Sequence, residues 1–573
     1  MNKIRPFILG LAVVLSALFA FGLFTLPAPK DADHDGFASA RVVKDIEILS
    51  KEHHSVAHPV ERARVREYLV NRLEGLGADT VMLFEYDSLV GPKNRHVVYT
   101  FDAVNVLAEF APENNADSAA YLLFVAHYDS RYSQPMPKDT VWSYGAADDG
   151  YGVGVILEAM SQALMQRSSW KQGVKVLFTD AEEVGMMGMT AMWERNREVF
   201  DNVGLVINVE ARGPYGPALM FEACPGNEKV LELYASAAKY PFTYSLTTVV
   251  YKFMPNFTDF TIIKDSLPGL NFSTIADVNH YHTDLDNFSN INEKSIQHYG
   301  EQIFPVTMAY LTSEEYSDKD ALRAELDQTN FTVPGLGLIG FSPAGYKVFC
   351  VAVFLIFLLL FALEGFRGRL KALRVFKTSG VVLGAALGVL LLGEAYAWIC
   401  AAIVGTKFKL FGVVQGIPFD NAAMILFVAM VFAGTLIIYL NSRAKAARSA
   451  AGSMRASATF TAMSANALNL LYAGMALLLV LSAALLFTLG ENMMFLIPLT
   501  CAMAAIVMWR VTSVKTWLVL AVALILLHAF SFLYALAMAL TIGALGAVAM
   551  IAFLDFIVLI PLADLYLSYP KKK

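Results

Sequence analysis

Cysteine is scarce in this sequence: the chain of 573 residues contains four. Cys350, Cys400 and Cys501 fall in apolar segments, which leaves Cys224 alone in the more polar part of the chain. A disulfide framework needs several cysteines that can pair within one domain. The sequence therefore excludes such a framework, and cysteine usage does not indicate a redox compartment.

Basic residues are the minority of charged residues in one part of the chain, and acidic residues are the minority in the other. Residues 31–344 carry 44 Asp and Glu against 24 Lys and Arg, whereas residues 345–573 carry 17 Lys and Arg against 6 Asp and Glu. An acidic domain joined to a basic apolar one argues against nucleic acid as a partner. Hydrophobic residues make up 56% of the chain, which is too many for a wholly soluble protein. We therefore expect part of the chain to have the lipid bilayer as its partner.

Long uncharged runs predict the membrane segments. Residues 7–26 are long enough to span a bilayer, and TLPAPK after them lacks a good cleavage site, so we predict an uncleaved anchor. Seven more apolar segments are expected at 346–363, 380–404, 421–440, 467–490, 493–509, 516–537 and 543–567. The predicted domains are a cytoplasmic N-terminus with its anchor (1–27), a more polar domain (28–344) and an all-α bundle of about seven helices (345–573).

Basic residues predict the orientation of these spans. They precede the first run as Lys3 and Arg5, and they follow every second later segment, ending with Lys571–Lys573. Because basic loops stay on the cytoplasmic side, residues 28–344 should face away from the cytoplasm. Glu394 and Asp555 lie inside apolar runs, where a helix–helix hydrogen bond competes with a transport or ligand role. The oligomeric state is not predicted.

Strand-like and helix-like segments alternate within residues 28–344. Helical patterns occupy 40–54 and the stretch that Pro59 opens and Gly77 closes, and strand-like runs include VMLFEYD, HVVYTFDAVNVLAEF and YLLFVAHYD. This alternation predicts an α/β sheet, mixed and largely parallel, between two layers of helices.

Potential metal ligands follow the predicted strands in order along the chain. They occur in AHYDS (His127, Asp129), GAADDGYG (Asp148), TDAEEVG (Glu182, Glu183), NVEARG (Glu210) and YHT (His282). Each fragment alone is weak, since HxD, adjacent Glu residues or a single His occur widely for structural reasons. Catalytic groups of open α/β sheets gather beyond the carboxyl ends of strands, so these side chains should meet at one edge of the sheet.

These motifs resemble the M28 family of zinc metallopeptidases, in the branch of endoplasmic reticulum metallopeptidases and vacuolar membrane proteases. The matching stretches also include HHSVAHPVERARVREYL, FEACPGN, PNFTDF and YHTDLDN, and they lie within a resemblance that extends over roughly residues 35–310. The resemblance implies an M28-type sandwich and two Zn²⁺ ions. His127 and Glu210 would hold one ion, Glu183 and His282 would hold the other, and Asp148 would bridge both.

The resemblance also implies the catalytic roles. Glu182 would be the general base, Asp129 would stand behind His127, and the peptide between Asp148 and Asp149 would often be cis. Imidazole and carboxylate are ligands that zinc prefers, and a carboxylate two residues after a histidine can orient its ring.

We expect a membrane-bound zinc metallopeptidase acting on peptide substrates, of aminopeptidase type by resemblance. A glutaminyl cyclase-like zinc enzyme remains an alternative, as does a receptor or transporter that kept the peptidase fold to bind peptides. Weaker candidates for substrate contact are Asn256, Phe257, Asp259, Phe260, Tyr281 and Arg212. Met186, Met187, Met189 and Met192 are interpreted mainly as core residues.

Overall fold

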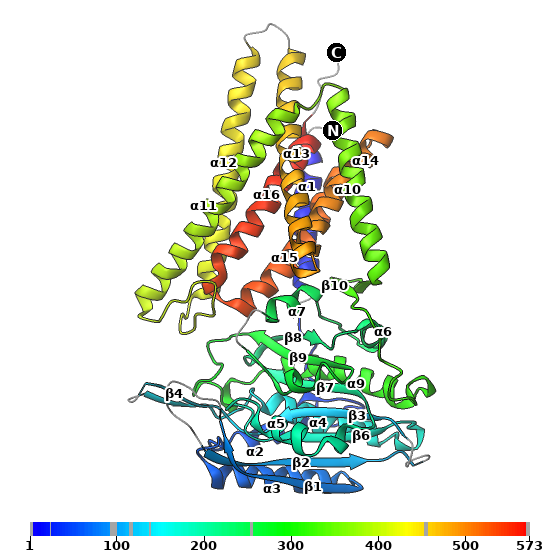
Figure 1. The fold of residues 1–573 in the computed structure, drawn as a ribbon. Helices are drawn as coiled ribbons and strands as arrows, with labels where there is room; N and C mark the ends of the chain where they lie inside the picture. The colour runs from blue at the N-terminus through cyan, green and yellow to red at the C-terminus, as the bar shows by residue number, and fades with distance from the viewer. Residues whose placement is uncertain are drawn as a thin grey trace. The chain divides into compact units, whose positions relative to one another are not determined.

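The computed structural model describes residues 4–22, 25–91, 100–113, 119–136, 139–252, 256–451 and 456–568. The chain divides into two compact units (Figure 1). The sheet unit comprises Phe24–Thr332 and Leu336–Pro343, and the helical unit comprises Met1–Leu23, Val333–Gly335 and Ala344–Lys573. Lys3 and Lys571–Lys573, which contribute to the predicted orientation of the spans, lie outside the described residues.

A seven-stranded sheet forms the centre of the sheet unit, in the order β1-β2-β6-β3-β7-β9-β8. The neighbours β6, β3, β7 and β9 run parallel, and β2, β1 and β8 are antiparallel edge additions. The strands are β1 (Thr80–Val90), β2 (Thr100–Phe110), β3 (Tyr121–His127), β6 (Gly173–Thr179), β7 (Val203–Ala211), β8 (Tyr215–Ala223) and β9 (Gly269–Ala276). Two small hairpins are added by β4 (Tyr132–Met136) with β5 (Asp139–Trp142) and by β10 (Thr329–Val333) with β11 (Gly337–Phe341).

Helices cover the sheet in two groups. The first group, α2, α4 and α9, packs together and contacts β3, β7 and β8, while α5 and α8 pack together and contact β1, β2 and β3. The helices are α2 (Ser39–Leu49), α3 (Pro59–Gly75), α4 (Gly150–Leu164), α5 (Met187–Arg195), α6 (Glu228–Ala237), α7 (Ser245–Lys252), α8 (Asp259–Ile263) and α9 (Glu293–Thr312). The predicted α/β fold, a mixed and largely parallel sheet between helices, is confirmed.

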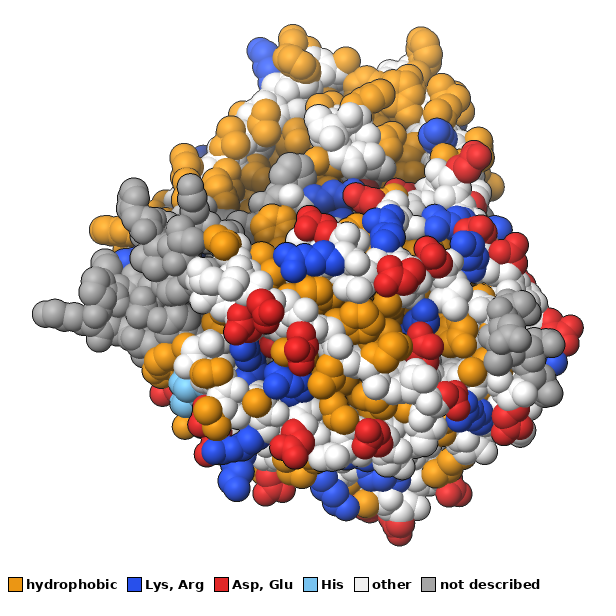
Figure 2. Space-filling model, turned by 60° about the horizontal axis from the view of Figure 1, so that its bottom comes forward, with side chains coloured by type: hydrophobic (Ala, Val, Ile, Leu, Met, Phe, Trp, Pro, Cys, Tyr) orange, Lys and Arg blue, Asp and Glu red, His pale blue; other side chains and the backbone are white. Residues whose placement is uncertain are grey.

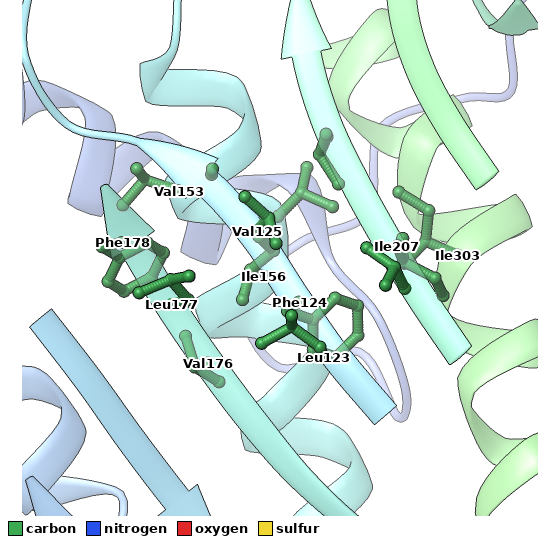
Figure 3. Close-up of a cluster of buried hydrophobic side chains, with 14 of the residues drawn as sticks. Leu123, Phe124, Val125, Val153, Ile156, Val176, Leu177, Phe178, Ile207 and Ile303 are labelled. Carbon is green, nitrogen blue, oxygen red and sulfur yellow. The ribbon is translucent and has the colours of Figure 1, made fainter. Parts of the chain in front are cut away.

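The core lies where the parallel strands meet α4 and α9. Every residue of β3, β6 and β7 is buried, as expected for parallel strands covered on both faces. Figure 3 shows Val125 of β3 and Leu177 of β6 beside Val153 and Ile156 of α4, with Ile207 of β7 near Ile303 of α9. This packing holds the carboxyl ends of three strands in fixed positions.

Two local predictions need comment. The helix expected over 40–54 ends at Leu49, because the chain turns after Ser50 and the histidines beyond it take up other contacts. The helix opened by Pro59 ends at Gly75, and Gly77 follows with φ +82, a left-handed conformation that glycine adopts without strain. The predicted strand run from residue 96 is described only from Thr100.

Among the described residues, eight helices are long and apolar enough to cross a membrane, the number that the sequence predicts. They are α1 (Ile4–Gly22), α10 (Pro343–Phe366), α11 (Ala372–Val404), α12 (Asp420–Ala451), α13 (Ala456–Leu489), α14 (Met493–Thr512), α15 (Thr516–Leu540) and α16 (Leu545–Leu567). The last helix, α16, contacts α11, α12, α13 and α15 and is the most buried of the set.

The surface of the sheet unit carries many charged side chains, unlike the surface of a protein embedded in a membrane. Figure 2 shows acidic and basic side chains interspersed over the visible face, with apolar side chains between them. By contrast, α11 exposes large apolar residues along its length, such as Leu391 and Ile403, as expected for a helix that faces lipid.

Candidate metal centre

Three neighbouring parallel strands deliver the predicted ligands to one edge of the sheet. His127 is the last residue of β3, Glu182 and Glu183 follow β6, and Glu210 is the penultimate residue of β7. Because β6, β3 and β7 are adjacent and parallel, their carboxyl ends coincide, as the sequence predicts. Asp148 enters from the turn before α4, and His282 comes from the loop after β9.

Asp148 lies between two histidines. Its Oδ1 is 3.2 Å from His127 Nε2, and its Oδ2 is 3.2 Å from His282 Nε2. Glu210 Oε2 lies 3.6 Å from His127 Nε2, and Glu183 Oε2 lies 3.2 Å from His282 Nε2. Each oxygen of one carboxylate therefore belongs to a different His–Glu pair.

Two groups of potential ligands result, and Asp148 belongs to both. The first contains His127, Asp148 and Glu210, and the second contains Asp148, Glu183 and His282; in each, one ligand atom per residue lies within 4.8 Å of the others. The residues predicted as metal ligands are thus brought together, although their binding of metal stays a prediction.

The turn before α4 fixes Asp148. Asp149 caps the helix, since its carboxylate accepts a hydrogen bond from the amide of Gly152 at 2.9 Å. The peptide bond between Asp148 and Asp149 is cis, as the resemblance implies. The carboxylate of Asp286 accepts hydrogen bonds from the amides of Ala147 at 2.7 Å and Asp148 at 3.3 Å.

Asp129 has a position that the resemblance only partly describes. Its backbone carbonyl, 2.9 Å from His127 Nδ1, orients the imidazole, whereas its carboxylate lies 3.6 Å from that nitrogen. The carboxylate instead accepts hydrogen bonds from the amides of Glu182 at 2.9 Å and Glu183 at 3.3 Å. Asp129 therefore positions both the histidine and the two adjacent glutamates.

The backbone has a positive φ at His282 and at the residue before Glu182. His282 has φ +60, and Ala181, which precedes Glu182, has φ +59. Non-glycine residues in this region cost about 1–3 kcal/mol and tend to occur at functional sites. No side chain fits at Gly188 in the same loop, because a Cβ there would lie 2.1 Å from the carbonyl oxygen of Asp180.

Two residues of the site, Asp286 and Arg131, were not predicted to act there, and Asp259 was predicted only as a weaker candidate for substrate contact. Asp286 holds the Asp148 turn, Arg131 Nη1 lies 3.0 Å from Glu183 Oε2, and Asp259 accepts a hydrogen bond from Thr179 while its Oδ1 is buried. The YHTDLDN and AHYDSR stretches contain the first two, but neither has a spacing that distinguishes it from surface charge.

Burial and charge shift the titration of the centre. Burial by itself lowers the pKa of His127, but hydrogen bonds to the surrounding carboxylates outweigh it and raise that pKa well above 6.5. Burial raises the pKa of Asp148, but the adjacent His127 and His282 reverse the effect and lower it. Burial raises the pKa of Glu182 well above 4.5, and neighbouring carboxylates add to the shift. The carboxyl groups are thus crowded where little water can screen their charge.

The residues fit a divalent cation. Asp148 Oδ2, Glu183 Oε1 and His282 Nε2 are buried and have no hydrogen-bond partner among the described residues. Buried polar atoms normally have partners, and an ion is one explanation for their absence. Two imidazole nitrogens with carboxylate oxygens are a donor set that suits zinc.

The weaker candidates divide between the core and the site. Met189, Met192 and Phe260 are fully buried in the core of the sheet unit. Tyr281 stacks on His282 with ring centroids 3.6 Å apart, and Arg212 lies over the Tyr281 ring at 6.0 Å. Phe257 is 61% exposed. Tyr281 is therefore the candidate most directly attached to the centre.

The sequence matches a protein family and several known proteins. Residues 105–307 match Peptidase family M28. Endoplasmic reticulum metallopeptidase 1 of Mus musculus is 28% identical over 276 residues, which cover 47% of this chain and 29% of that protein. The vacuolar membrane protease of Yarrowia lipolytica is 26% identical over 223 residues, covering 38% of this chain and 21% of that protein. The chain matches less than a third of the length of either relative.

Two solved structures are each similar to about half of the chain. A glutaminyl cyclase from Porphyromonas gingivalis has 19% identity and a TM-score of 0.38, covering 48% of this chain and 99% of its own. A Zn-dependent exopeptidase from Parabacteroides distasonis has 20% identity and a TM-score of 0.36, covering 47% and 98%. On the family match, residues 105–307, which include His127, Asp148, Glu183, Glu210 and His282, form a domain of peptidase family M28.

Proposed function

We propose that this chain is a membrane-bound metallopeptidase that hydrolyses peptide bonds with two zinc ions and removes residues from peptide N-termini. The observation that carries the proposal is the position of Asp148. Its two oxygens lie at 3.2 Å from two different histidines, each of which has its own glutamate. A pair of nearby cations needs such a shared anionic ligand.

Zinc, when bound, supplies Lewis acidity toward a carbonyl and lowers the pKa of water. His127, Asp148 and Glu210 would hold one ion, and Asp148, Glu183 and His282 would hold the other. The remaining chemistry belongs to Glu182. Its backbone amide is fixed by Asp129, and its carboxylate is available because Glu183 supplies the ligand atom of this pair.

Glu182 would act as general base and then as general acid. Its carboxylate takes a proton from water, the water oxygen forms a bond to the scissile carbonyl carbon, and the C–N bond breaks. Glu182 then returns the proton to the leaving amine. We propose that the catalytic domain lies on the non-cytoplasmic side, because basic residues follow every second predicted membrane segment after it.

The test is digestion of a peptide library by the full chain in detergent, followed by mass spectrometry. We expect products shortened from the N-terminus by wild type, and no products after chelation or with Glu182→Gln. Glu194→Gln, on the surface of α5, is the matched control and should cleave like wild type. Cleavage that persists under strong chelation, or in Glu182→Gln, would contradict the proposal.

One observation favours a second candidate, a glutaminyl cyclase-like enzyme with a single zinc. Arg131 donates a hydrogen bond to Glu183 Oε2, the oxygen that also lies beside His282. A cation already sits on one ligand of the second group, which favours one metal ion over two. The same library should contain peptides with N-terminal Gln. Their conversion to pyroglutamate, with one zinc per chain, would select this candidate.

A peptide receptor or transporter is the third possibility. It predicts that peptides bind without being cut and that Glu182→Gln changes nothing. Binding measured alongside digestion distinguishes it from both enzymes.

A further inference from the structure

A surface cavity of about 450 Å³ lies at the start of α11 in the helical unit. Three cations and three other side chains line it: Lys371, Arg374, Lys377, Leu373, Thr378 and Val381. Helical spacing explains this set, because residues 371, 374 and 378 form one row on the helix and residues 373, 377 and 381 form the next. The cavity thus combines three cations with the apolar side chains of Leu373 and Val381.

The three cations have no acidic partner among the described residues. The carboxylate at the end of α10, Glu364, is already paired with three guanidinium groups: Arg510 Nε lies 2.9 Å from it, Arg369 Nη1 lies 3.3 Å from it and Arg367 Nη1 lies 3.7 Å from it. It therefore cannot neutralise Lys371, Arg374 and Lys377. Positive charge at this end of the helical unit exceeds what the protein itself balances, which favours an anionic ligand.

The apolar part of the same surface faces outward. Leu373 is 67% exposed, Phe376 is 77% exposed and Val381 is 73% exposed, all within a helix that is apolar enough to span a membrane. Long cationic side chains at the end of such a helix extend toward the headgroup region of the bilayer. A ligand that fills this surface must combine negative charge with an apolar body.

We infer that this cavity binds the headgroup of an anionic phospholipid, with Lys371, Arg374 and Lys377 on the phosphate and Leu373 and Val381 on the first part of the acyl chains. Clusters of basic residues beside a membrane span recognise anionic lipids in this way. Inorganic phosphate offers the same charge but leaves Leu373 and Val381 without a contact. The inference does not depend on the peptidase function, because it uses no residue of the metal centre.

The experiment is native mass spectrometry of the full chain in detergent, titrated with phosphatidylglycerol or phosphatidylcholine. The test variant is Arg374→Gln/Lys377→Gln. Lys445→Gln/Arg448→Gln removes one lysine and one arginine from exposed positions at the end of α12, so it is the matched control. The charge-conserving swap Arg374→Lys/Lys377→Arg tests whether charge at the cavity suffices.

We expect wild type to retain phosphatidylglycerol in preference to phosphatidylcholine. Retention should fall at least about tenfold in Arg374→Gln/Lys377→Gln, since each basic residue near a membrane surface contributes about 1 kcal/mol, and should stay within twofold in the control and in the swap. Equal loss in test and control would show attraction by general charge and overturn the inference. Displacement of the lipid by millimolar inorganic phosphate, or unchanged retention in the test variant, would overturn it as well.

Discussion

Buried carboxylates have different neighbours in the two units. In the helical unit, Asp564 lies 2.8 Å from the guanidinium of Arg443 and accepts a hydrogen bond from Tyr439, and Glu364 lies between Arg369 and Arg510. In the sheet unit, the carboxylates around Asp148 face two histidines and one another. The first arrangement balances its own charge, whereas in the second Arg131 pairs with Glu183 and the other carboxylates are balanced only when a cation is added.

This difference indicates which buried charges are structural and which are chemical. A carboxylate with a guanidinium partner within the fold has its desolvation offset by that partner. Carboxylates gathered without one are expensive to bury, and proteins retain such clusters where metal or catalysis requires them. Glu394, Glu491 and Asp555 are exceptions in the helical unit, because each has a buried carboxylate oxygen without a hydrogen-bond partner among the described residues.

The largest effect is expected from Glu182→Gln. Removing a general base should lower kcat for peptide hydrolysis about 10²–10⁴-fold, while zinc content measured by atomic absorption stays at the wild-type level. Asp555→Asn removes a buried carboxylate from the helical unit instead and should leave kcat within twofold. A comparable fall in both variants would remove the distinction between the units.

Asp286→Asn should weaken zinc binding about 10–100-fold, since Asp286 holds the turn that presents Asp148 and residues that orient ligands typically contribute this much. Competition with a chromophoric chelator measures the affinity. The exposed Asp284, two residues away, provides the control Asp284→Asn. Unchanged affinity in Asp286→Asn would mean that the turn holds its shape without this carboxylate.

Asp564→Asn should act on stability rather than on chemistry. The substitution weakens the contacts with Arg443 and Tyr439, so we expect the free energy of unfolding to fall by about 1–2 kcal/mol. Activity per folded molecule should stay at the wild-type value. Thermal unfolding in detergent together with active-site zinc content separates the two quantities, and a loss of zinc in this variant would contradict the comparison.

The smallest effect concerns His298, a buried histidine of α9 whose Nδ1 accepts a hydrogen bond from the amide of Ala218. Burial lowers the pKa of His298 to about 3, while an unfolded histidine titrates near 6.5. Between these values the unfolded chain binds a proton that the folded chain does not, so stability rises with pH. Because of this residue, the free energy of unfolding should fall by at most about 1.4 kcal/mol for each pH unit below pH 6.5. Above pH 6.5 the residue should not change it.

Thermal unfolding of the full chain in detergent, from pH 5 to pH 8, checks this pH dependence. His298→Gln should flatten the dependence relative to wild type, whereas His34→Gln, at an exposed position, should not. Equal slopes for wild type and His298→Gln would show that the buried ring titrates normally.

Much of this protein could be predicted from order along the chain. Apolar runs predict eight membrane helices because a bilayer sets the length of an apolar helix, and α11 differs mainly by beginning at Ala372 instead of residue 380. The mostly apolar runs of β3, β6 and β7 are typical of parallel strands covered on both faces, and these strands are buried along their whole length. The sequence also predicts the residue types of the potential metal ligands and the strand ends that carry them.

Tertiary structure decided which groups meet. Asp286 and Arg131 lie in loops whose sequences resemble ordinary polar surface, Asp259 begins α8, and only the folded chain brings the three to Asp148, Glu183 and Thr179. The orientation of His127 by the backbone carbonyl of Asp129 is likewise invisible in the sequence, because every residue has a carbonyl. Sequence by itself determined the composition and the order of the elements, since these depend on local periodicity and solvent preference. The pairing of polar atoms depended on distances between segments far apart in the chain, which only the packing of the sheet and its helices could set.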